Sequence, residues 1–577
     1  MVKKYFDKRV FMIFALIGFA FGFFQLTGWE LAENGNILWT GAYVSRLSFL
    51  CLLIGVLTGA LSCILQGCLV GKVSAIQSEA LHMEQEKDKK GILSSKGFLW
   101  MISFLLIVLC WLPCYLAYYP GICAYDTTIQ LGQVESGAYN DHHPIAHTLL
   151  LDGFMSLGEK VFHDVNTGLA LLVLFQMLAL AAVLAWGIVL LADRGVTKWI
   201  LVCLQIASMV YPFHMYMSVS VCKDVLFTVF FLLQMLALYE MIRRRKSGPD
   251  RYDVLFAVAS VGMQLYRNNG RYAMLVLMVI LLLAVIGGKG ARKFWGKVAV
   301  NCAFSLIVGS LCISGLFRIT GAEQGDRREM LSMPIQQLAR CMIYHGGVGV
   351  MAEDDATMDE DSKGVINDFL LNESYKEYRP DIADPVKRHT NTYVVRYRTE
   401  DFARTYLSLL GKYPGDFINA ALAVNSGYFY VGDESHAYIN VNGRDTGLGY
   451  VQTRFLTEEL NSRGVYQDSK WKSLYDMMEK WADGNVYLNL PVLKYLFVPG
   501  TFFWMYMLLA GYLLVYKKYD RCVPLALIMG YYATLILGPT VQLRYIYPLM
   551  IVLPFGALMA MCRGGSKEMK NEQSEQK

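Results

Sequence analysis

One carboxylate in a segment rich in aromatic residues is the first candidate for chemistry in this sequence. Asp126 follows the apolar run 98–119, which Pro120-Gly121 breaks. Partial burial moves the pKa of a carboxylate toward the working pH, which suits a general base that takes a proton from a hydroxyl. Because Asp126 also opens an amphipathic stretch, a helix N-cap explains the same residue equally well. We therefore predict either a catalytic base or a cap at this position.

A histidine cluster follows about fifteen residues later. His142, His143 and His147 come directly after Asp141. The i, i+4 spacing of His143 and His147 would place both rings on one helix face, where they could ligate a divalent metal. Pro144 instead favours the first helical position, which leaves His143 at the cap. Substrate contact and a plain interfacial role are the alternatives to a metal, and no cofactor is certain.

Basic side chains recur in three short loops between apolar runs. Arginine binds phosphate through two parallel hydrogen bonds, and lysine supplies a compact charge. An acid in the first turn of a helix is ordinary dipole compensation, and each cation alone is an ordinary snorkelling anchor. Together the loops favour an anionic head group as ligand. The candidate residues are Lys223, Asp224, Arg267, Asn268, Arg271, Arg544 and Tyr545.

Amide, aromatic and basic residues elsewhere are candidates for contacts with a polar substrate. They are Tyr125, Gln130, Gln336, Gln337 and Arg340. The first two flank Asp126, and a solvated role is their alternative. The other three lie in a long polar segment that could reach the loop of Asp126. For these three, the packed core of a helical domain is the more common explanation.

The composition places these residues in a membrane protein. Hydrophobic residues make up 55% of the 577 residues, charged residues 18%, and the mean hydropathy is +0.35. Apolar runs of about 17–25 residues recur, which is the length that crosses a bilayer as a helix. The first run lacks a small-residue cleavage site, so we expect an uncleaved helix rather than a signal peptide. We predict about twelve spans, at residues 10–27, 44–71, 98–119, 168–192, 198–213, 224–241, 252–265, 272–288, 295–317, 493–516, 522–538 and 544–562.

Lysine and arginine determine the expected orientation. Loops with clustered cations alternate with loops that hold few, and such clusters remain on the cytoplasmic side. The alternation predicts a cell-membrane protein with both termini cytoplasmic. Two long segments then lie outside. Residues 120–167 contain two interfacial helices, near 125–134 and 145–162, and residues 318–492 form a mostly helical cap over the outer mouth of the bundle.

The predicted fold is mostly α, a polytopic helical bundle of about twelve spans with one large extracytoplasmic domain. Its parts are an N-terminal two-helix hairpin with a cytoplasmic loop at 1–96, a catalytic-type transmembrane module at 97–317, the cap at 318–492, C-terminal transmembrane helices at 493–562, and a cytoplasmic tail at 563–577.

The distribution of charge and cysteine excludes several classes of protein. The interiors of the predicted spans hold almost no ionisable side chains, which argues against a proton-coupled carrier and favours reaction at the outer interface. The net charge of +5 is explained by the cytoplasmic loops and does not imply nucleic acid as a partner. The thirteen cysteines lie mostly in apolar runs without paired spacing, so we predict no disulfide framework and no cysteine metal motif.

The order of these parts resembles the GT-C superfamily of polytopic membrane glycosyltransferases, in particular a bacterial branch of it. The shared elements are Tyr-Pro-Gly…Asp…Gln, His-His-Pro, Lys-Asp, Ser-x-Pro-x-Gln-Gln and Arg-Tyr-x-x-Pro, over residues 97–562. The resemblance implies a polyprenyl-phosphate sugar donor, an inverting single displacement, and an envelope glycan, lipid or protein as acceptor. By position, Asp126 matches the catalytic acid of the first loop and Arg544 a phosphate contact. Asp126 stands alone, where many relatives have a paired acidic motif.

Two other functions fit parts of the pattern. A transporter or flippase of lipid-linked glycans predicts paired halves, polar residues within the spans and small loops, which this sequence lacks. A non-catalytic envelope-assembly protein would keep the fold without needing Asp126. The favoured hypothesis is a glycosyltransferase, embedded in the lipid bilayer, that acts on an extracytoplasmic acceptor.

Overall fold

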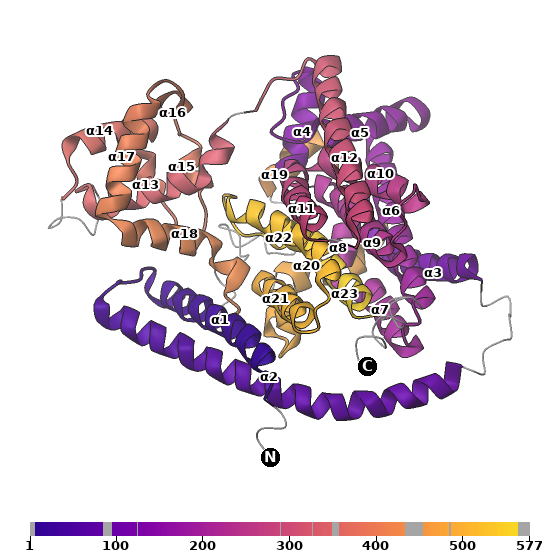
Figure 1. The fold of residues 1–577 in the computed structure, drawn as a ribbon. Coiled ribbons are helices and arrows are strands. Elements are labelled where there is room, and N and C mark those ends of the chain that lie inside the picture. The colour runs from indigo at the N-terminus through magenta and orange to yellow at the C-terminus, as the bar shows by residue number, and fades with distance from the viewer. Residues whose placement is uncertain are drawn as a thin grey trace.

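The computed structural model describes residues 6–84, 95–123, 125–288, 290–325, 327–348, 357–432, 454–483 and 486–562 (Figure 1). Helices dominate this part of the chain, and it contains isolated β-bridges but no strand. The expected mostly-α fold is therefore confirmed. The predicted tail, 563–577, lies outside the described residues.

The N-terminal part of the chain is a helical hairpin. It consists of α1 (Lys8–Asn34) and α2 (Gly41–Glu84). The Asp7 side chain caps α1, which ends at Gly35 in the left-handed conformation. Small residues let the two helices approach closely, because a Cβ on Gly55 would lie 2.7 Å from the Ala15 carbonyl.

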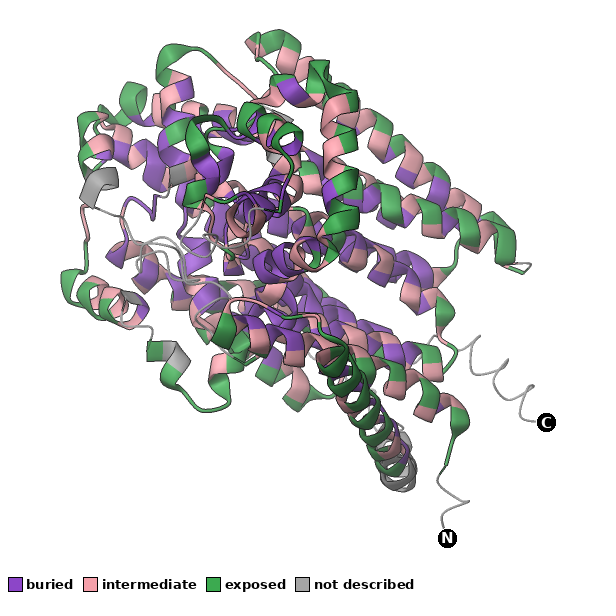
Figure 2. Ribbon diagram, turned by 90° about the vertical axis from the view of Figure 1, so that its left-hand side faces the viewer, coloured by how far each residue is buried: buried purple, intermediate pink, exposed green. Residues whose placement is uncertain are grey.

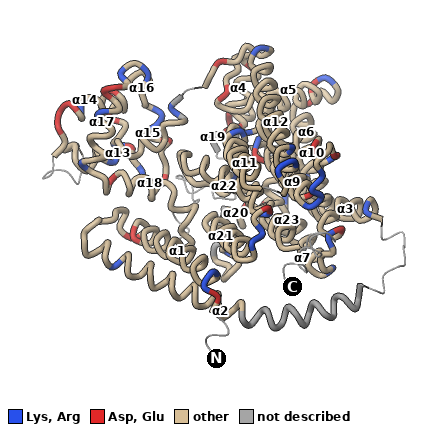
Figure 3. The backbone as a smooth tube through the Cα atoms, in the orientation of Figure 1, with Lys and Arg blue, Asp and Glu red and all other residues tan. Residues whose placement is uncertain are grey.

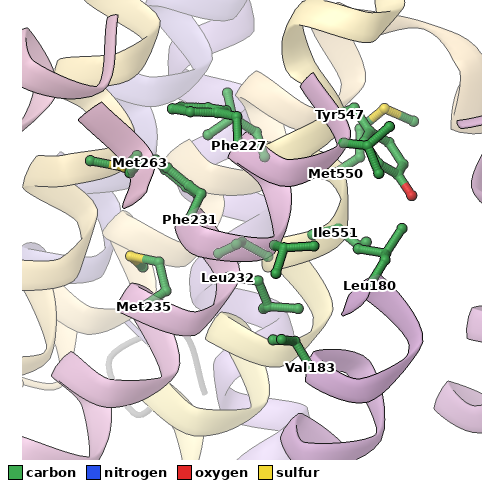
Figure 4. Close-up of a cluster of buried hydrophobic side chains, with 14 of the residues drawn as sticks. Leu180, Val183, Phe227, Phe231, Leu232, Met235, Met263, Tyr547, Met550 and Ile551 are labelled. Carbon is green, nitrogen blue, oxygen red and sulfur yellow. The ribbon is translucent and has the colours of Figure 1, made fainter. Parts of the chain in front are cut away.

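The bundle contains most of the long helices. They are α3 (Lys96–Ala117), α6 (Val165–Asp193), α7 (Lys198–Val210), α8 (Pro212–Ser218), α9 (Lys223–Arg244), α10 (Arg251–Tyr266), α11 (Asn268–Gly287), α12 (Arg292–Thr320), α21 (Pro499–Val515), α22 (Val523–Ile536) and α23 (Leu543–Met561). Among the helices long enough to cross a membrane, α9 is the most buried. Figure 4 shows its side chains meeting those of α6, α10 and α23, including Leu180, Phe227, Phe231, Met263 and Ile551. Buried residues concentrate where these helices meet (Figure 2).

Each of the twelve predicted spans coincides with helical structure. Within the described residues, eight helices are individually long and apolar enough to cross a membrane: α1, α2, α3, α6, α9, α11, α12 and α23. The α7–α8 pair is bent by 52° where Pro212 begins α8. Helices α10, α21 and α22 have only 16, 17 and 14 residues. These long apolar helices indicate a membrane protein.

Two shorter helices follow α3 at the predicted places. They are α4 (Tyr125–Ser136) and α5 (Ile145–Leu157), which continues into a π-helical turn, η3 (Gly158–Phe162). The loop between α4 and α5 pairs with the chain that follows α12, through the backbones of Asp141 and Glu323.

The segment predicted as one cap, 318–492, divides into two parts. The first is a lobe with its own apolar core, around Ile335, Phe369 and Phe417, and it lies to one side of α4 and α5 (Figure 1). The lobe consists of η4 (Arg327–Leu331), α13 (Ser332–His345), α14 (Glu360–Phe369), η5 (Leu371–Glu377), α15 (Asp384–Lys387), α16 (Thr392–Tyr397), α17 (Thr399–Lys412) and α18 (Pro414–Phe429). The described helices of this segment therefore do not form the single cap over the bundle that the sequence predicts.

The second part packs on the bundle because its apolar residues, such as Leu460, Val465 and Ala482, join the main core. It consists of α19 (Arg454–Ser462), α20 (Lys472–Asp483), η7 (Val486–Asn489) and η8 (Leu493–Phe497), while η9 (Tyr519–Cys522) links α21 to α22. The backbone N–H of Asp468 donates to the Tyr119 carbonyl, and Arg463 donates to the Thr128 carbonyl. This part, rather than the lobe, covers the loop that carries Asp126.

Charged residues are sparse along the long helices and gather near their ends (Figure 3). At the end formed by the C-termini of α6 and α9, the fully buried Glu240 pairs with Arg194 at 3.0 Å and with Arg243 at 2.6 Å. Arg245 pairs with Asp520 at the same end. A second group of charges lies at the opposite end of α9, where that helix begins.

Candidate active site

Two loops are joined by backbone hydrogen bonds at the start of α9. Ile122 donates to the Val219 carbonyl at 2.9 Å and accepts from the Val221 N–H at 2.8 Å. The Thr127 hydroxyl adds a bond to the Val221 carbonyl. Only glycine fits at position 121, since φ is +151° and a Cβ would lie 2.6 Å from a Val173 methyl group. This junction brings the first turn of α4 beside the first turn of α9.

Asp126 and Lys223 meet at this junction. The Asp126 carboxylate lies 3.1 Å from the Lys223 ammonium and 3.1 Å from the Arg544 guanidinium. The three side chains are 15%, 14% and 14% exposed, so the cluster is not completely buried. Asp126 and two of the cations predicted to lie outside the membrane, Lys223 and Arg544, are therefore neighbours.

A second ion pair lies directly beside the first. Asp224 is fully buried and pairs with Arg267 at 2.6 Å, while Arg544 lies 3.9 Å from the other Asp224 oxygen. Arg267 also donates to the Tyr531 hydroxyl and lies over the Tyr545 ring at 4.7 Å. Burial alone would lower the pKa of Arg267, but the Asp224 carboxylate raises it above its usual value. Among the residues that the structure describes here, these two carboxylates and three cations sum to one net positive charge.

The loop before α23 positions Arg544. Gln542 accepts from the Arg544 Nε at 2.6 Å. Thr540, two residues earlier, donates its hydroxyl to the Asp381 carbonyl, and Ile382 forms a β-bridge with it. The lobe therefore contacts the site through the backbone of the loop that leads to Arg544.

The charge state of Asp126 differs from the expectation. Burial by itself would raise the pKa of Asp126, but the nearby charges of Arg544 and Lys223 outweigh it and hold the pKa well below its usual range. The prediction that its pKa lies near the working pH is therefore wrong for the cluster as it stands. Asp126 is an ionised acceptor that two cations already occupy.

The imidazoles of His143 and His147 are neutral. Burial and then the Lys223 charge lower the pKa of His143 to about 2 and that of His147 to about 3. Lys223 lies 2.8 Å from the His143 Nδ1. The fully buried His147 lies between two amides, with Nδ1 at 3.1 Å from the Gln130 oxygen and Nε2 at 3.4 Å from the Gln176 nitrogen. Gln130 and His147 thus contact each other.

The metal hypothesis for His143 and His147 receives no support from this geometry. An ammonium ion at 2.8 Å from one ring repels a cation, and the other ring faces amides. In the part of the chain that the structure describes, no group of three or more His, Cys, Asp or Glu side chains could hold a metal ion.

Several predicted site residues lie away from the cluster. Gln336, Gln337 and Arg340 are buried within the lobe, where Gln336 donates to the Arg379 carbonyl and Arg340 pairs with Asp416 at 3.0 Å. Figure 1 shows that α13, which carries them, is well separated from α4. Their substrate contact is therefore not supported, because these side chains are buried and bond within the lobe, and Arg340 also donates to Asn36 of the hairpin turn.

Three more predicted residues lie at the margin. Arg271 faces a groove between α11 and α12, lined by Leu275, Leu306, Ile307, Ser310, Leu311 and Ser314. Asn268 is exposed, and His142 is exposed with its ring 4.6 Å from that of His143. The side chain of Tyr125 lies outside the described residues.

Sequence reasoning missed Tyr531 and Gln176. Tyr531 links the two sides of the cluster, since it receives the Arg267 bond and donates to the Tyr545 carbonyl. Both residues lie inside apolar helices, where a lone polar side chain carries no signal of the partner it will meet.

A family of unknown function, DUF6020, matches residues 134–576 of the chain. No curated protein and no solved structure matches the chain. The matched range contains Lys223, Arg267 and Arg544, whereas Asp126 and the N-terminal hairpin precede it. Since the match covers more than half of the sequence, the chain belongs to the DUF6020 family of unknown function.

Proposed function

We propose that this protein is a membrane glycosyltransferase that moves a sugar from a polyprenyl-phosphate donor to an extracytoplasmic acceptor of the cell envelope. The observation that carries the proposal is the Asp126 carboxylate, shared by Lys223 and Arg544 at 3.1 Å each. Such a reaction requires a base for the acceptor hydroxyl and cations for the departing phosphate. The resemblance to the GT-C superfamily supports a sugar as the transferred group.

The proposed topology has twelve spans, with both termini cytoplasmic and the Asp126 cluster at the outer surface. The opposite end of α9 supports this topology. It carries Arg243, Arg244 and Arg245, and clustered arginines are retained on the cytoplasmic side. An outer site is consistent with the small residual exposure of the cluster.

In the proposed reaction, the acceptor oxygen attacks the anomeric carbon from the face opposite the phosphate. The new C–O bond forms as the bond to the phosphate oxygen breaks, and the phosphate leaves with the electron pair. Arg544 and Lys223 stabilise the charge that develops on that phosphate. Asp126 takes the proton of the acceptor hydroxyl and later releases it to water.

Substrate binding strengthens the base in this scheme. Lys223 and Arg544 hold the pKa of Asp126 well below its usual range, where a carboxylate is a weak base. A phosphate group attracts the same two cations. As they turn toward it, the charge that depresses the pKa of Asp126 is partly neutralised, and the carboxylate becomes more basic when both substrates are present.

The test is sugar transfer from a labelled prenyl-phosphate sugar in membranes that contain each variant. Asp126→Asn keeps the size of the side chain and removes the base, so we expect transfer to fall by roughly 10²–10⁴-fold. Arg544→Gln removes a phosphate contact and should lower transfer as well. Arg271→Gln is the matched control, because this arginine lies outside the cluster and its replacement should leave transfer unchanged.

Two results would contradict the proposal. One is wild-type transfer activity in Asp126→Asn, when the variant has the same thermal unfolding temperature as the wild type. The other is wild-type protein that moves the labelled lipid across the membrane without transferring its sugar, which indicates a flippase.

A further inference from the structure

One ring nitrogen at the cluster lacks a hydrogen-bond partner. His143 is 3% exposed, and its Nε2 atom is buried with no partner among the described residues. Buried polar atoms are normally satisfied, so an exception beside a group of charges needs an explanation. The other ring nitrogen, Nδ1, is only 2.8 Å from the Lys223 ammonium that pairs with Asp126.

Lys223 determines which nitrogen of this ring carries the proton. An ammonium group only donates, so the His143 Nδ1 must accept. Burial and then Lys223 lower the pKa of His143 to about 2, and the ring is therefore neutral with its one proton on Nε2. The unpartnered atom is an N–H donor that points to a missing acceptor.

We propose that the His143 Nε2–H donates a hydrogen bond to a phosphate oxygen of the bound substrate, and that Lys223 is the positioning residue that fixes this tautomer. The lipid-linked form of the phosphate rests on the proposed function, whereas the geometry requires only an anionic oxygen. The net positive charge of the cluster favours such a ligand, and the partly exposed Arg544 and Lys223 leave it a way in.

This assignment excludes two other roles for His143. A nitrogen that carries a proton cannot ligate a metal, and the nitrogen without one is occupied by Lys223. For the same reason the ring cannot act as the base of the reaction. Its part is to bind and orient the phosphate beside Asp126.

The test compares two replacements of His143. Glutamine keeps an N–H donor at about the distance of Nε2, and leucine keeps the bulk without a donor. The probe is a labelled short-chain prenyl monophosphate that binds to purified protein in detergent. We expect His143→Leu to weaken binding by about 10- to 100-fold and His143→Gln by less than about 3-fold. Binding of the uncharged prenol should be the same in all three proteins.

The pH profile tests the neutral tautomer. The charged and titratable groups around the ring are Lys223, Asp126, His142 and Arg544. The ratio of wild-type to His143→Leu affinity should be constant between about pH 5.5 and 7.5, because the ring does not titrate there. The positioning role is tested in the Lys223→Met background. There the ring can carry its proton on either nitrogen, so adding His143→Leu should weaken binding less than it does in the wild-type background.

Each alternative outcome is informative. The donor role is overturned if His143→Leu binds the prenyl phosphate as tightly as wild type. It is also overturned if the leucine and glutamine variants lose affinity equally while both keep the thermal stability of wild type. A ratio that falls with rising pH indicates an imidazolium and overturns the neutral tautomer. An equal effect of His143→Leu in the wild-type and Lys223→Met backgrounds removes the positioning role of Lys223.

Inorganic phosphate separates the two possible sources of the ligand. If it binds as tightly as the prenyl phosphate and shows the same loss in His143→Leu, the donor role stands and the lipid-linked source is wrong. If phosphate binding depends on His143 but the wild-type protein does not transfer sugar, the proposed function is wrong and the donor role of His143 still stands.

Discussion

His147 has the spacing of a metal ligand but belongs to a buried chain of hydrogen bonds. The Gln176 amide faces its Nε2, its Nδ1 faces the Gln130 oxygen, and the Gln130 amide donates to the Thr148 hydroxyl at 3.0 Å. A neutral ring can donate through Nδ1–H to the Gln130 oxygen and accept at Nε2 from the Gln176 amide, whereas an imidazolium would direct a second N–H at that amide nitrogen. These hydrogen bonds join α4, α5 and α6, and they therefore help to hold α4, the helix that carries Asp126.

This neutral ring should make stability depend on pH. The pKa of His147 is about 3 in the folded protein, below the ordinary value of 6.5, so the unfolded chain binds more protons between these values. Stability is therefore lost as pH falls from 6.5 toward 3. One such histidine contributes a loss of about 1.4 kcal/mol at about pH 5.5. His147→Gln should start less stable at pH 7.5 and lose less on acidification, as measured by thermal unfolding in detergent.

The control for His147 is Asn367→Ala, because that exposed side chain does not titrate and its replacement should leave the pH dependence as in wild type. An equal loss in wild type and His147→Gln would show that the His147 ring is not held neutral.

The candidate site could be predicted in part from residue type and position. Asp126, Lys223 and Arg544 carry charge at helix ends, and charges that leave a bilayer on the same side tend to meet. The failure of Gln336 and Arg340 has a physical cause. Polar side chains at helical spacing look the same whether a ligand or a neighbouring helix satisfies them, and here Asp416 and the Arg379 carbonyl do so.

At the scale of elements, the hairpin is attached to the lobe through a polar contact. Asn419 of α18 is 2% exposed and donates to the Asn36 side chain at 2.6 Å and to the Ile37 carbonyl at 3.0 Å. It also accepts from the Trp39 indole at 2.8 Å. Asn36 in turn accepts from Arg340. One amide therefore joins the turn of the hairpin to the lobe core.

Replacing this amide should loosen the hairpin turn. Asn419→Ala leaves the Ile37 carbonyl and the Trp39 indole without their partner, and each buried orphan costs about 1–3 kcal/mol. We expect faster hydrogen exchange of residues 31–40 in the variant, measured by mass spectrometry. Asn367→Ala, at an exposed position of the same lobe, should leave this exchange unchanged. Unchanged exchange in Asn419→Ala would show that apolar contacts of α1 hold the hairpin without the amide.

The fold also explains why the lobe could not be placed from sequence. Its helices alternate apolar and polar residues in the same way as α19 and α20, and nothing in that pattern tells which core they join. The structure separates them, with Phe417 in the lobe core and Leu460 in the bundle core. The 382–383 segment still pairs with the loop before Arg544, so the lobe touches the site from the side.

At the scale of the whole molecule, α9 connects the two groups of charges. Its 22 residues span about 33 Å, close to the thickness of the hydrocarbon core of a bilayer. Lys223 and Asp224 lie at one end and Glu240 with its arginines at the other. Most side chains between them are apolar and buried. If the helix crosses a membrane completely, the two charged groups lie at its two surfaces.

The arginine-rich end of α9 should face the cytoplasm, because clustered cations are retained on that side. An epitope inserted after Gly248, in the exposed loop that follows α9, should then be detected only after the membrane is opened. An epitope after Gly137, in the exposed loop that follows α4, should be detected on intact cells. The reverse pattern would invert the proposed topology and put the Asp126 cluster in the cytoplasm. Detection of both epitopes from one side would mean that α9 does not cross the bilayer, and neither an outer active site nor an envelope acceptor would remain tenable.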